Sequence, residues 1–416
     1  MSSDLGHDIT HARHTARGVS PSTHARFFVL PSAVAPHYCI ASIAIIVMIA
    51  RVLRAFSRRS ERKIYDIVPC GAHSHDARDF ESTMFIYLSK KIAIPNGVRL
   101  KSLSWNGEQG WIVCGGENGL LKVLKLDSTR QIDEKGGGGG GPSSLSMNQT
   151  LKGHKSAVLC CCWNETYRKL TTVDQYGLII VWMLHKGMWY EEMINNRNKS
   201  TVRGMRWTPD AERICIIYED GAVIVGTVDG NRLWGKEFKM ELSHVEWSPD
   251  GRSILFGTLQ CQVHIYDANG SYLSSLPLYC LDDAGSPTSI IGIDWYDGAE
   301  GVQDSNQPTL AIAFENGRLQ LMRHEADDSP VLVDTGLHAA KLEWATNGTM
   351  LALAGTYGSP ADGREVAMVQ FYNPHGQLLR TLKVPGGGIQ SVSWEGGSLR
   401  IALAVDTFIY FADISL

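Results

Sequence analysis

The stretch Val202–Val228, VRGMRWTPDAERICIIYEDGAVIVGTV, shows how this chain folds locally. It contains three short apolar strands, Val202–Trp207, Arg213–Tyr218 and Ala222–Val228, separated by the polar turns TPDAE and EDG. Nothing in the stretch has the length and apolar period of a helix. It therefore predicts an antiparallel meander, which cannot bury both of its faces alone and needs neighbours of the same kind.

The same unit recurs from Met84 to the end of the chain. Each copy begins with a strand that ends in tryptophan, and successive tryptophans are roughly 40 to 58 residues apart. These blade markers are Trp105, Trp163, Trp207, Trp247, Trp295, Trp344 and Trp394. A period in the forties with four short strands per repeat is typical of a WD-type blade. We therefore predict an all-β fold, a seven-bladed WD40-type β-propeller over residues 84–416.

The two ends of this region complement each other. The last repeat stops one strand short, whereas FIYLSKKIAI at 85–94 is a strand with no repeat of its own. A ring has no unpaired edges only if both ends meet in one blade. We therefore predict that Phe85–Lys90 supplies the outer strand of the seventh blade.

Tryptophan at the end of an inner strand has a packing explanation. Adjacent blades pack face to face, and large side chains fill the space between twisted sheets. One buried tryptophan removes about 150–250 Å² from water, so replacing Trp207 or Trp247 by alanine is expected to cost about 3–5 kcal/mol. We interpret the blade markers as core residues rather than as a ligand platform.

One repeat has the residue types of the hydrogen-bonded tetrad that stiffens WD blades. His154 follows Gly153, as in the Gly-His signature of these repeats, and Thr172, Asp174 and Trp182 lie downstream. Because the spacing from Asp174 to Trp182 is longer than in the usual pattern, we expect only part of the tetrad to form.

Residues 1–83 differ in composition from the rest of the chain. They are polar, rich in His, Ser, Thr and Arg, and lack a sustained period, which predicts a largely disordered N-terminal extension. Residues 38–50, YCIASIAIIVMIA, are an uncharged run followed by arginines, the pattern of a membrane anchor. The run is short for a span of about 20 residues, so an extension in front of a domain that begins at Met84 is the favoured interpretation.

Composition and motifs exclude several functions. The chain is 44% apolar and 20% charged with a formal net charge of −4, which does not favour nucleic acid as a partner. No sequence motif of a hydrolase, metalloprotease or nucleotide-binding loop occurs, so we predict neither enzymatic activity nor a cofactor. Consecutive Cys160, Cys161 and Cys162 alternate in direction along a strand and cannot share one metal ion.

Segment 191–200, EEMINNRNKS, is the candidate partner contact. It is charged, does not repeat elsewhere, and is predicted to be a loop between two blades. Loops on a rigid scaffold often bind partners, so Glu191, Glu192 and Arg197 are the candidate contact residues. The alternative is that the segment only connects the blades.

Several segments resemble a known family. LIIVWMLHKGMWYEEMINNRNKS, YEDGAVIVGTVDGNRLWGK, RTLKVPG and SWEGGSLRIALAVDTFIYFADI are similar to the amino-terminal propeller of a WD-repeat subunit family of the intraflagellar transport A complex. The similarity runs from Met84 to Leu416. A tubby-like family with WD repeats shares some of this region.

The resemblance implies a non-enzymatic scaffold that acts in retrograde ciliary transport, ciliary entry of membrane-protein cargo and cilium assembly. It implies other subunits of the complex and cargo as partners, and the cilium, basal body and cytoplasm as locations. The resemblance also implies a second propeller and a helical-repeat tail, neither of which is expected within these 416 residues. The alternatives are a WD-repeat adaptor outside cilia, either tubby-like or a ubiquitin-ligase receptor, and a membrane-anchored propeller.

Overall fold

The computed structural model describes residues 84–126, 145–197, 200–281, 288–298, 306–358 and 365–415. These residues form 28 strands, arranged as seven four-stranded antiparallel sheets, and two short 3-10 segments, η1 (Pro95–Gly97) and η2 (Glu117–Gly119). The seven-bladed β-propeller predicted from the sequence is confirmed. The predictions for residues 1–83, including the apolar run at 38–50, lie outside the described residues.

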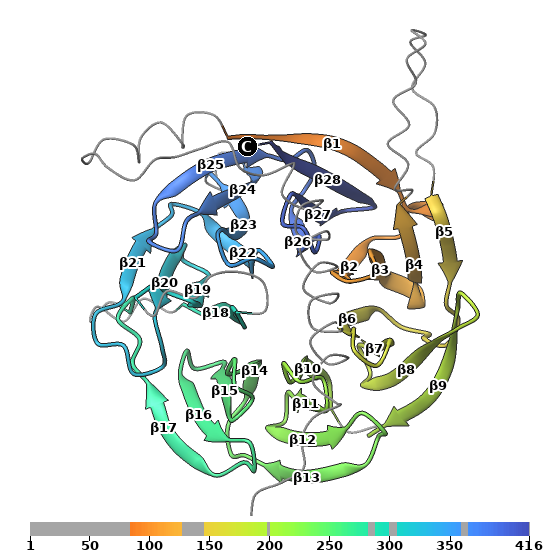
Figure 1. The fold of residues 1–416 in the computed structure, drawn as a ribbon, viewed down its shortest axis with the longest axis horizontal. Helices are drawn as coiled ribbons and strands as arrows, with labels where there is room; N and C mark the ends of the chain where they lie inside the picture. The colour runs from red at the N-terminus through yellow and green to blue at the C-terminus, as the bar shows by residue number, and fades with distance from the viewer. Residues whose placement is uncertain are drawn as a thin grey trace, which may run out of the picture. The chain divides into compact units, whose positions relative to one another are not determined.

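Six blades are built from four consecutive strands, numbered outward from the centre of the ring (Figure 1). Blades 1 to 3 are β2–β5 (Leu100–Trp105, Trp111–Gly116, Leu121–Leu126, Leu145–Thr150), β6–β9 (Val158–Asn164, Lys169–Asp174, Leu178–His185, Met188–Asn196) and β10–β13 (Val202–Trp207, Arg213–Tyr218, Ala222–Thr227, Arg232–Glu237). Blades 4 to 6 are β14–β17 (Leu242–Trp247, Ser253–Thr258, Val263–Asp267, Tyr272–Leu276), β18–β21 (Ile290–Trp295, Leu310–Phe314, Arg318–Met322, Val331–Asp334) and β22–β25 (His338–Trp344, Leu351–Tyr357, Val366–Tyr372, Leu378–Lys383).

The seventh blade joins the two ends of the ring. Its inner strands are β26 (Ile389–Trp394), β27 (Arg400–Val405) and β28 (Phe408–Ser415), and its outermost strand is β1 (Phe85–Ala93). Figure 1 shows β1 and β28 side by side at the ring's edge. Their antiparallel register runs from Phe85 opposite Ser415 to Ala93 opposite Phe408. The predicted pairing of Phe85–Lys90 is therefore present, and it extends three residues further.

The core lies between the blades. Seven clusters of buried apolar side chains are present, and each combines residues from two neighbouring sheets. The smallest of them lies between blades 2 and 3. A single blade buries neither face alone, so the ring is the unit that stabilises every sheet.

A β-bulge recurs in the innermost strand of each blade, near its start. In blade 3 the register shifts between Val202 and Gly204, and in blade 4 between Leu242 and His244; the other five blades shift at equivalent places. A bulge increases local twist, which suits strands that crowd around the axis of a ring.

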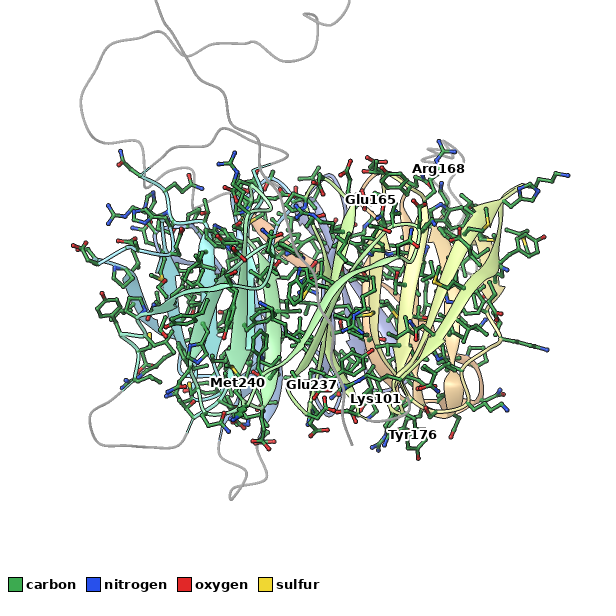
Figure 2. The ribbon with its side chains drawn as sticks, turned by 90° about the horizontal axis from the view of Figure 1, so that it is seen from below. Lys101, Glu165, Arg168, Tyr176, Glu237 and Met240 are labelled. Carbon is green, nitrogen blue, oxygen red and sulfur yellow. The ribbon has the colours of Figure 1, made fainter. Side chains whose placement is uncertain are left out.

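Turns at the strand ends form two opposite faces of the ring. Figure 2 shows Glu165 and Arg168 on one face, and Lys101 and Tyr176 on the other. The first face carries the turns between the first and second strands of each blade, where Glu165 accepts hydrogen bonds from the backbone of the neighbouring blade at Gly107 and Glu108.

Candidate functional site

The tetrad residues of blade 2 form a continuous chain of hydrogen bonds. Trp182 Nε1 donates to Thr172 Oγ1 at 2.9 Å, His154 Nε2 lies 2.8 Å from the same hydroxyl, and His154 Nδ1 lies 3.2 Å from Asp174 Oδ2. All four side chains are buried. The expectation of a partial tetrad was wrong, because Thr172 in β7 faces the same side of the sheet as Trp182 in β8 and bridges it to the histidine.

One arrangement of protons satisfies the hydrogen bonds of the tetrad. His154 donates from Nδ1 to the carboxylate, which leaves Nε2 to accept from the threonine hydroxyl. Burial lowers the pKa of His154 below its ordinary value, and Asp174 opposes this effect. Asp174 Oδ1 also accepts hydrogen bonds from the backbone N–H groups of Tyr176 and Leu178. The tetrad thus ties the chain before β6 to the turn between β7 and β8.

The blade-marker tryptophans lie where neighbouring inner strands meet. Indole Nε1 of Trp163 donates to the carbonyl of Ser104 at 3.1 Å, and that of Trp247 donates to the carbonyl of Arg206 at the same distance. Each bond crosses from one blade to the one before it. The indole of Trp394 makes the same kind of contact with blade 6.

The markers are not all equivalent. Five are buried, namely Trp105, Trp163, Trp247, Trp344 and Trp394, whereas Trp207 and Trp295 are partly exposed. Nε1 is buried without a hydrogen-bond partner among the described residues in three markers, Trp105, Trp207 and Trp344.

A central channel of about 680 Å³ is lined by the innermost strands. The residue before each marker tryptophan lines this channel, and in four blades (Arg206, Asp294, Glu343 and Ser393) its side chain bonds to the next blade. Asp294 accepts from the backbone N–H of Trp344 at 2.5 Å, and Ser393 Oγ accepts from that of Trp105 at 3.0 Å. The predictions from the sequence did not include these contacts, although a polar residue before the tryptophan is a signal for them.

Charges in the channel are partly paired. Arg206 Nε lies 2.9 Å from Glu246 Oε2, and this carboxylate raises the pKa of Arg206. Glu343 Oε1 accepts from Ser393 Oγ at 3.1 Å, and burial raises the pKa of Glu343 to about 8. Burial also raises the pKa of Asp294, with Glu246 adding to the effect. The channel therefore holds carboxyl groups that keep protons near neutral pH.

The predicted loop at 191–200 is mostly a strand. Glu191–Asn196 belongs to β9, the outermost strand of blade 2, and pairs with β8 from Trp182 opposite Glu191 to Leu178 opposite Asn196. The loop prediction was wrong because the outermost strand of a blade contacts solvent and does not need an apolar pattern. Residues 198–199 lie outside the described residues.

Two of the three candidate contact residues have partners within the propeller. Glu192 forms an ion pair with Lys169 at 2.9 Å. Arg197 pairs with Asp220 at 3.0 Å and with Glu237 at 3.1 Å, and its guanidinium lies over the ring of Tyr218. Glu191 is exposed on β9. Arg197 therefore connects blades 2 and 3, which distinguishes it from a solvated recognition residue.

The cysteines of β6 alternate as predicted. Cys161 packs with the cluster between blades 1 and 2, whereas Cys160 and Cys162 pack with the cluster between blades 2 and 3. The described part of the chain contains no group of three or more His, Cys, Asp or Glu side chains arranged to hold a metal ion. Over the same part, no helix is long and apolar enough to cross a membrane.

Comparison with known proteins identifies the propeller. A family model described as WDR35/TULP4 N-terminal matches residues 84–415. WD repeat-containing protein 35 from Rattus norvegicus and from Homo sapiens is 57% identical to this chain over 332 residues, which are 80% of this chain and 28% of each relative. Tubby-related protein 4 from Homo sapiens is 30% identical over 339 residues, covering 73% of this chain and 21% of that protein.

The chain thus spans just over a quarter of the length of the relatives named WD repeat-containing protein 35. The family match begins at the residue where the described structure begins and includes all seven blades. The chain belongs to the WDR35/TULP4 N-terminal family of WD-repeat β-propellers.

Proposed function

We propose that this chain is a non-enzymatic scaffold subunit of the intraflagellar transport A complex, acting in retrograde ciliary transport, ciliary entry of membrane-protein cargo and cilium assembly. The observation that carries the proposal is the 57% identity to WD repeat-containing protein 35 over the whole propeller. A rigid ring with two faces of turns suits a scaffold, because rigid elements present loops without reordering them. Its partners are other subunits of the complex and ciliary cargo, and its locations are the cilium, basal body and cytoplasm.

The test is recovery of the complex from ciliated cells. The full chain with an affinity tag is expressed in these cells, and the proteins that co-purify are quantified against a tag-only control. Enrichment of intraflagellar transport A subunits, together with a ciliary signal in microscopy, is the expected result. Absence of every subunit of the complex from a well-expressed, folded sample would contradict the proposal.

A second candidate is an adaptor outside cilia, which the 30% identity to Tubby-related protein 4 favours. The same purification distinguishes the two, because an adaptor of a ubiquitin ligase recovers ligase components in place of transport subunits. The third alternative, a membrane-anchored propeller that uses residues 38–50, predicts that the chain stays with membranes after carbonate extraction.

A further inference from the structure

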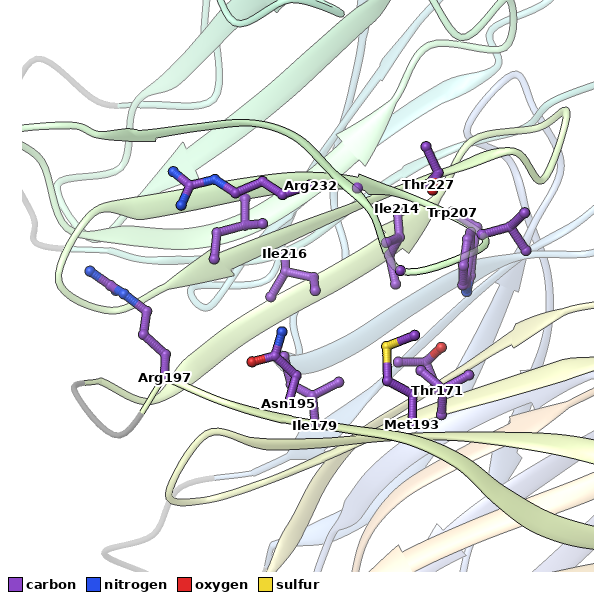
Figure 3. A pocket seen from close by; sticks show the side chains of 15 residues that line it. Thr171, Ile179, Met193, Asn195, Arg197, Trp207, Ile214, Ile216, Thr227 and Arg232 are labelled. Atoms are coloured by element: carbon purple, nitrogen blue, oxygen red, sulfur yellow. The ribbon is translucent and has the colours of Figure 1, made fainter.

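A cavity of about 320 Å³ separates the facing sheets of blades 2 and 3 (Figure 3). Its walls are mostly aliphatic, with Ile179 and Val181 from blade 2 and Ile214, Ile216 and Ile224 from blade 3. The volume is in the range of ligand pockets, about 300–1,000 Å³. The cavity adjoins the smallest of the seven interblade clusters.

Two polar atoms in the cavity wall have no hydrogen-bond partner among the described residues. They are Oγ1 of Thr171, a residue only 1% exposed, and Nε1 of Trp207. A buried polar group without a partner costs about 1–3 kcal/mol, and such groups are rare in folded proteins. The indole of Trp247, one blade further on, donates to a carbonyl of its neighbour. An occupant with an acceptor for the indole N–H of Trp207 and a hydrogen-bonding group for the hydroxyl of Thr171 would satisfy both atoms.

The opposite end of the cavity carries two arginines. Figure 3 shows Arg197 and Arg232 at one end and Thr171 and Trp207 toward the other. A second cavity of about 230 Å³ shares both arginines and is also lined by Glu237, which pairs with Arg197.

The arginines differ in how their charge is matched. Arg197 is matched by Asp220 and Glu237. Arg232 is exposed, and its guanidinium lies against Gly235 in the space that a Cβ atom there would fill. Two carboxylates thus lie at Arg197, whereas Arg232 has no ion pair among the described residues.

We propose that the cavity between blades 2 and 3 binds an extended acidic peptide of a partner protein. An aliphatic or aromatic side chain fills the apolar part, peptide main-chain groups bond to Thr171 and Trp207, and a carboxylate lies against Arg232. A small anion alone would leave the aliphatic walls empty, and an apolar peptide alone would leave the guanidinium unmatched. This inference does not depend on which complex the chain joins.

The experiment selects short random peptides, displayed as a library, against the folded full chain. Enriched peptides are then labelled and titrated by fluorescence anisotropy. We expect them to share an apolar residue close to an acidic one, and to lose binding when the acidic residue is changed to lysine. Added salt weakens the binding, because the contact includes an exposed ion pair.

Three variants locate the site. Arg232→Glu is expected to weaken binding at least about tenfold, since it removes a charge-assisted bond and adds repulsion. Thr171→Val weakens binding several-fold without lowering the thermal stability of the free protein, a combination that a merely structural role does not produce. The matched control is Arg252→Glu on blade 4, an arginine whose side chain is 86% exposed and pairs only loosely with Asp250 at 3.8 Å. It should bind as the parent does.

Three results would overturn the proposal. One is a selection that yields no binding peptide, and another is a consensus without an acidic residue. The third is equal binding by the parent, Arg232→Glu and Thr171→Val, which would place the peptides elsewhere on the ring.

Discussion

Two adjacent threonines in β7 provide a sharp test of the hydrogen-bond assignments. Thr171 and Thr172 are 1% and 0% exposed, and they face opposite sides of the same sheet. The hydroxyl of Thr172 is the centre of the tetrad, whereas that of Thr171 has no partner among the described residues. Replacing either residue by valine keeps the shape of the side chain and puts a methyl group in place of the hydroxyl.

The two substitutions should have opposite effects on the free energy of unfolding. Thr172→Val leaves His154 Nε2 and Trp182 Nε1 buried without partners, at a cost of about 1–3 kcal/mol for each. A total near 3 kcal/mol corresponds to a melting temperature lower by roughly 4 °C, from an unfolding entropy of about 2.1 cal/mol/K per residue over a propeller of this size. Thr171→Val removes an unsatisfied group and should leave stability unchanged or raise it by up to about 1 kcal/mol.

The assay is thermal unfolding followed by far-ultraviolet circular dichroism, with urea unfolding as a check on the size of the change. The propeller signal must be native in both variants before melting. Equal destabilisation by the two substitutions, or a Thr172→Val protein that melts like the parent, would refute the tetrad as drawn.

Three further predictions concern the tryptophans, the channel and β9. Trp247→Ala should cost about 4 kcal/mol in urea unfolding, and Trp207→Ala about half as much, because the second indole already faces a cavity and lacks a partner. Equal costs would contradict this difference. The pKa of Glu343 is about 8 in the folded state and about 4.5 in the unfolded state, so only the folded state holds this proton between these pH values. The free energy of unfolding should therefore fall by about 1–2 kcal/mol between pH 6.5 and 8. Glu343→Gln should reduce this dependence of stability on pH. An unchanged slope would contradict the assignment. Arg197→Glu should lower the melting temperature by breaking contacts between blades 2 and 3, whereas Glu191→Lys should not. Equal melting temperatures of the two variants would contradict a stabilising role of Arg197 between these blades.

The sequence predicted the ring because each blade repeats one local pattern. A strand that ends in tryptophan recurs seven times, and the three-stranded last repeat has a complement in the strand that begins at Phe85. The pairing of β1 with β28 follows from the cost of leaving a sheet edge unpaired, so it could be predicted without knowing how the side chains pack.

Other features depend on tertiary packing that no local pattern records. Glu191–Asn196 lacks apolar alternation because β9 contacts solvent, so its strand character comes only from pairing with β8. The bulges depend on how inner strands crowd the axis. The cavity beside Trp207 depends on the separation of two whole sheets, which no local sequence pattern records.

The most direct test of the closed ring is a disulfide between its first and last strands. Phe85 and Ser415 are opposite residues of β1 and β28, and both are exposed. A Phe85→Cys/Ser415→Cys protein should form this disulfide under mild oxidation, detected by mass spectrometry of non-reduced peptides, whereas Phe85→Cys/Ser146→Cys, with its second site on β5 of the neighbouring blade, should not. A disulfide that forms no faster in the first protein than in the second would contradict the closure of the propeller by β1.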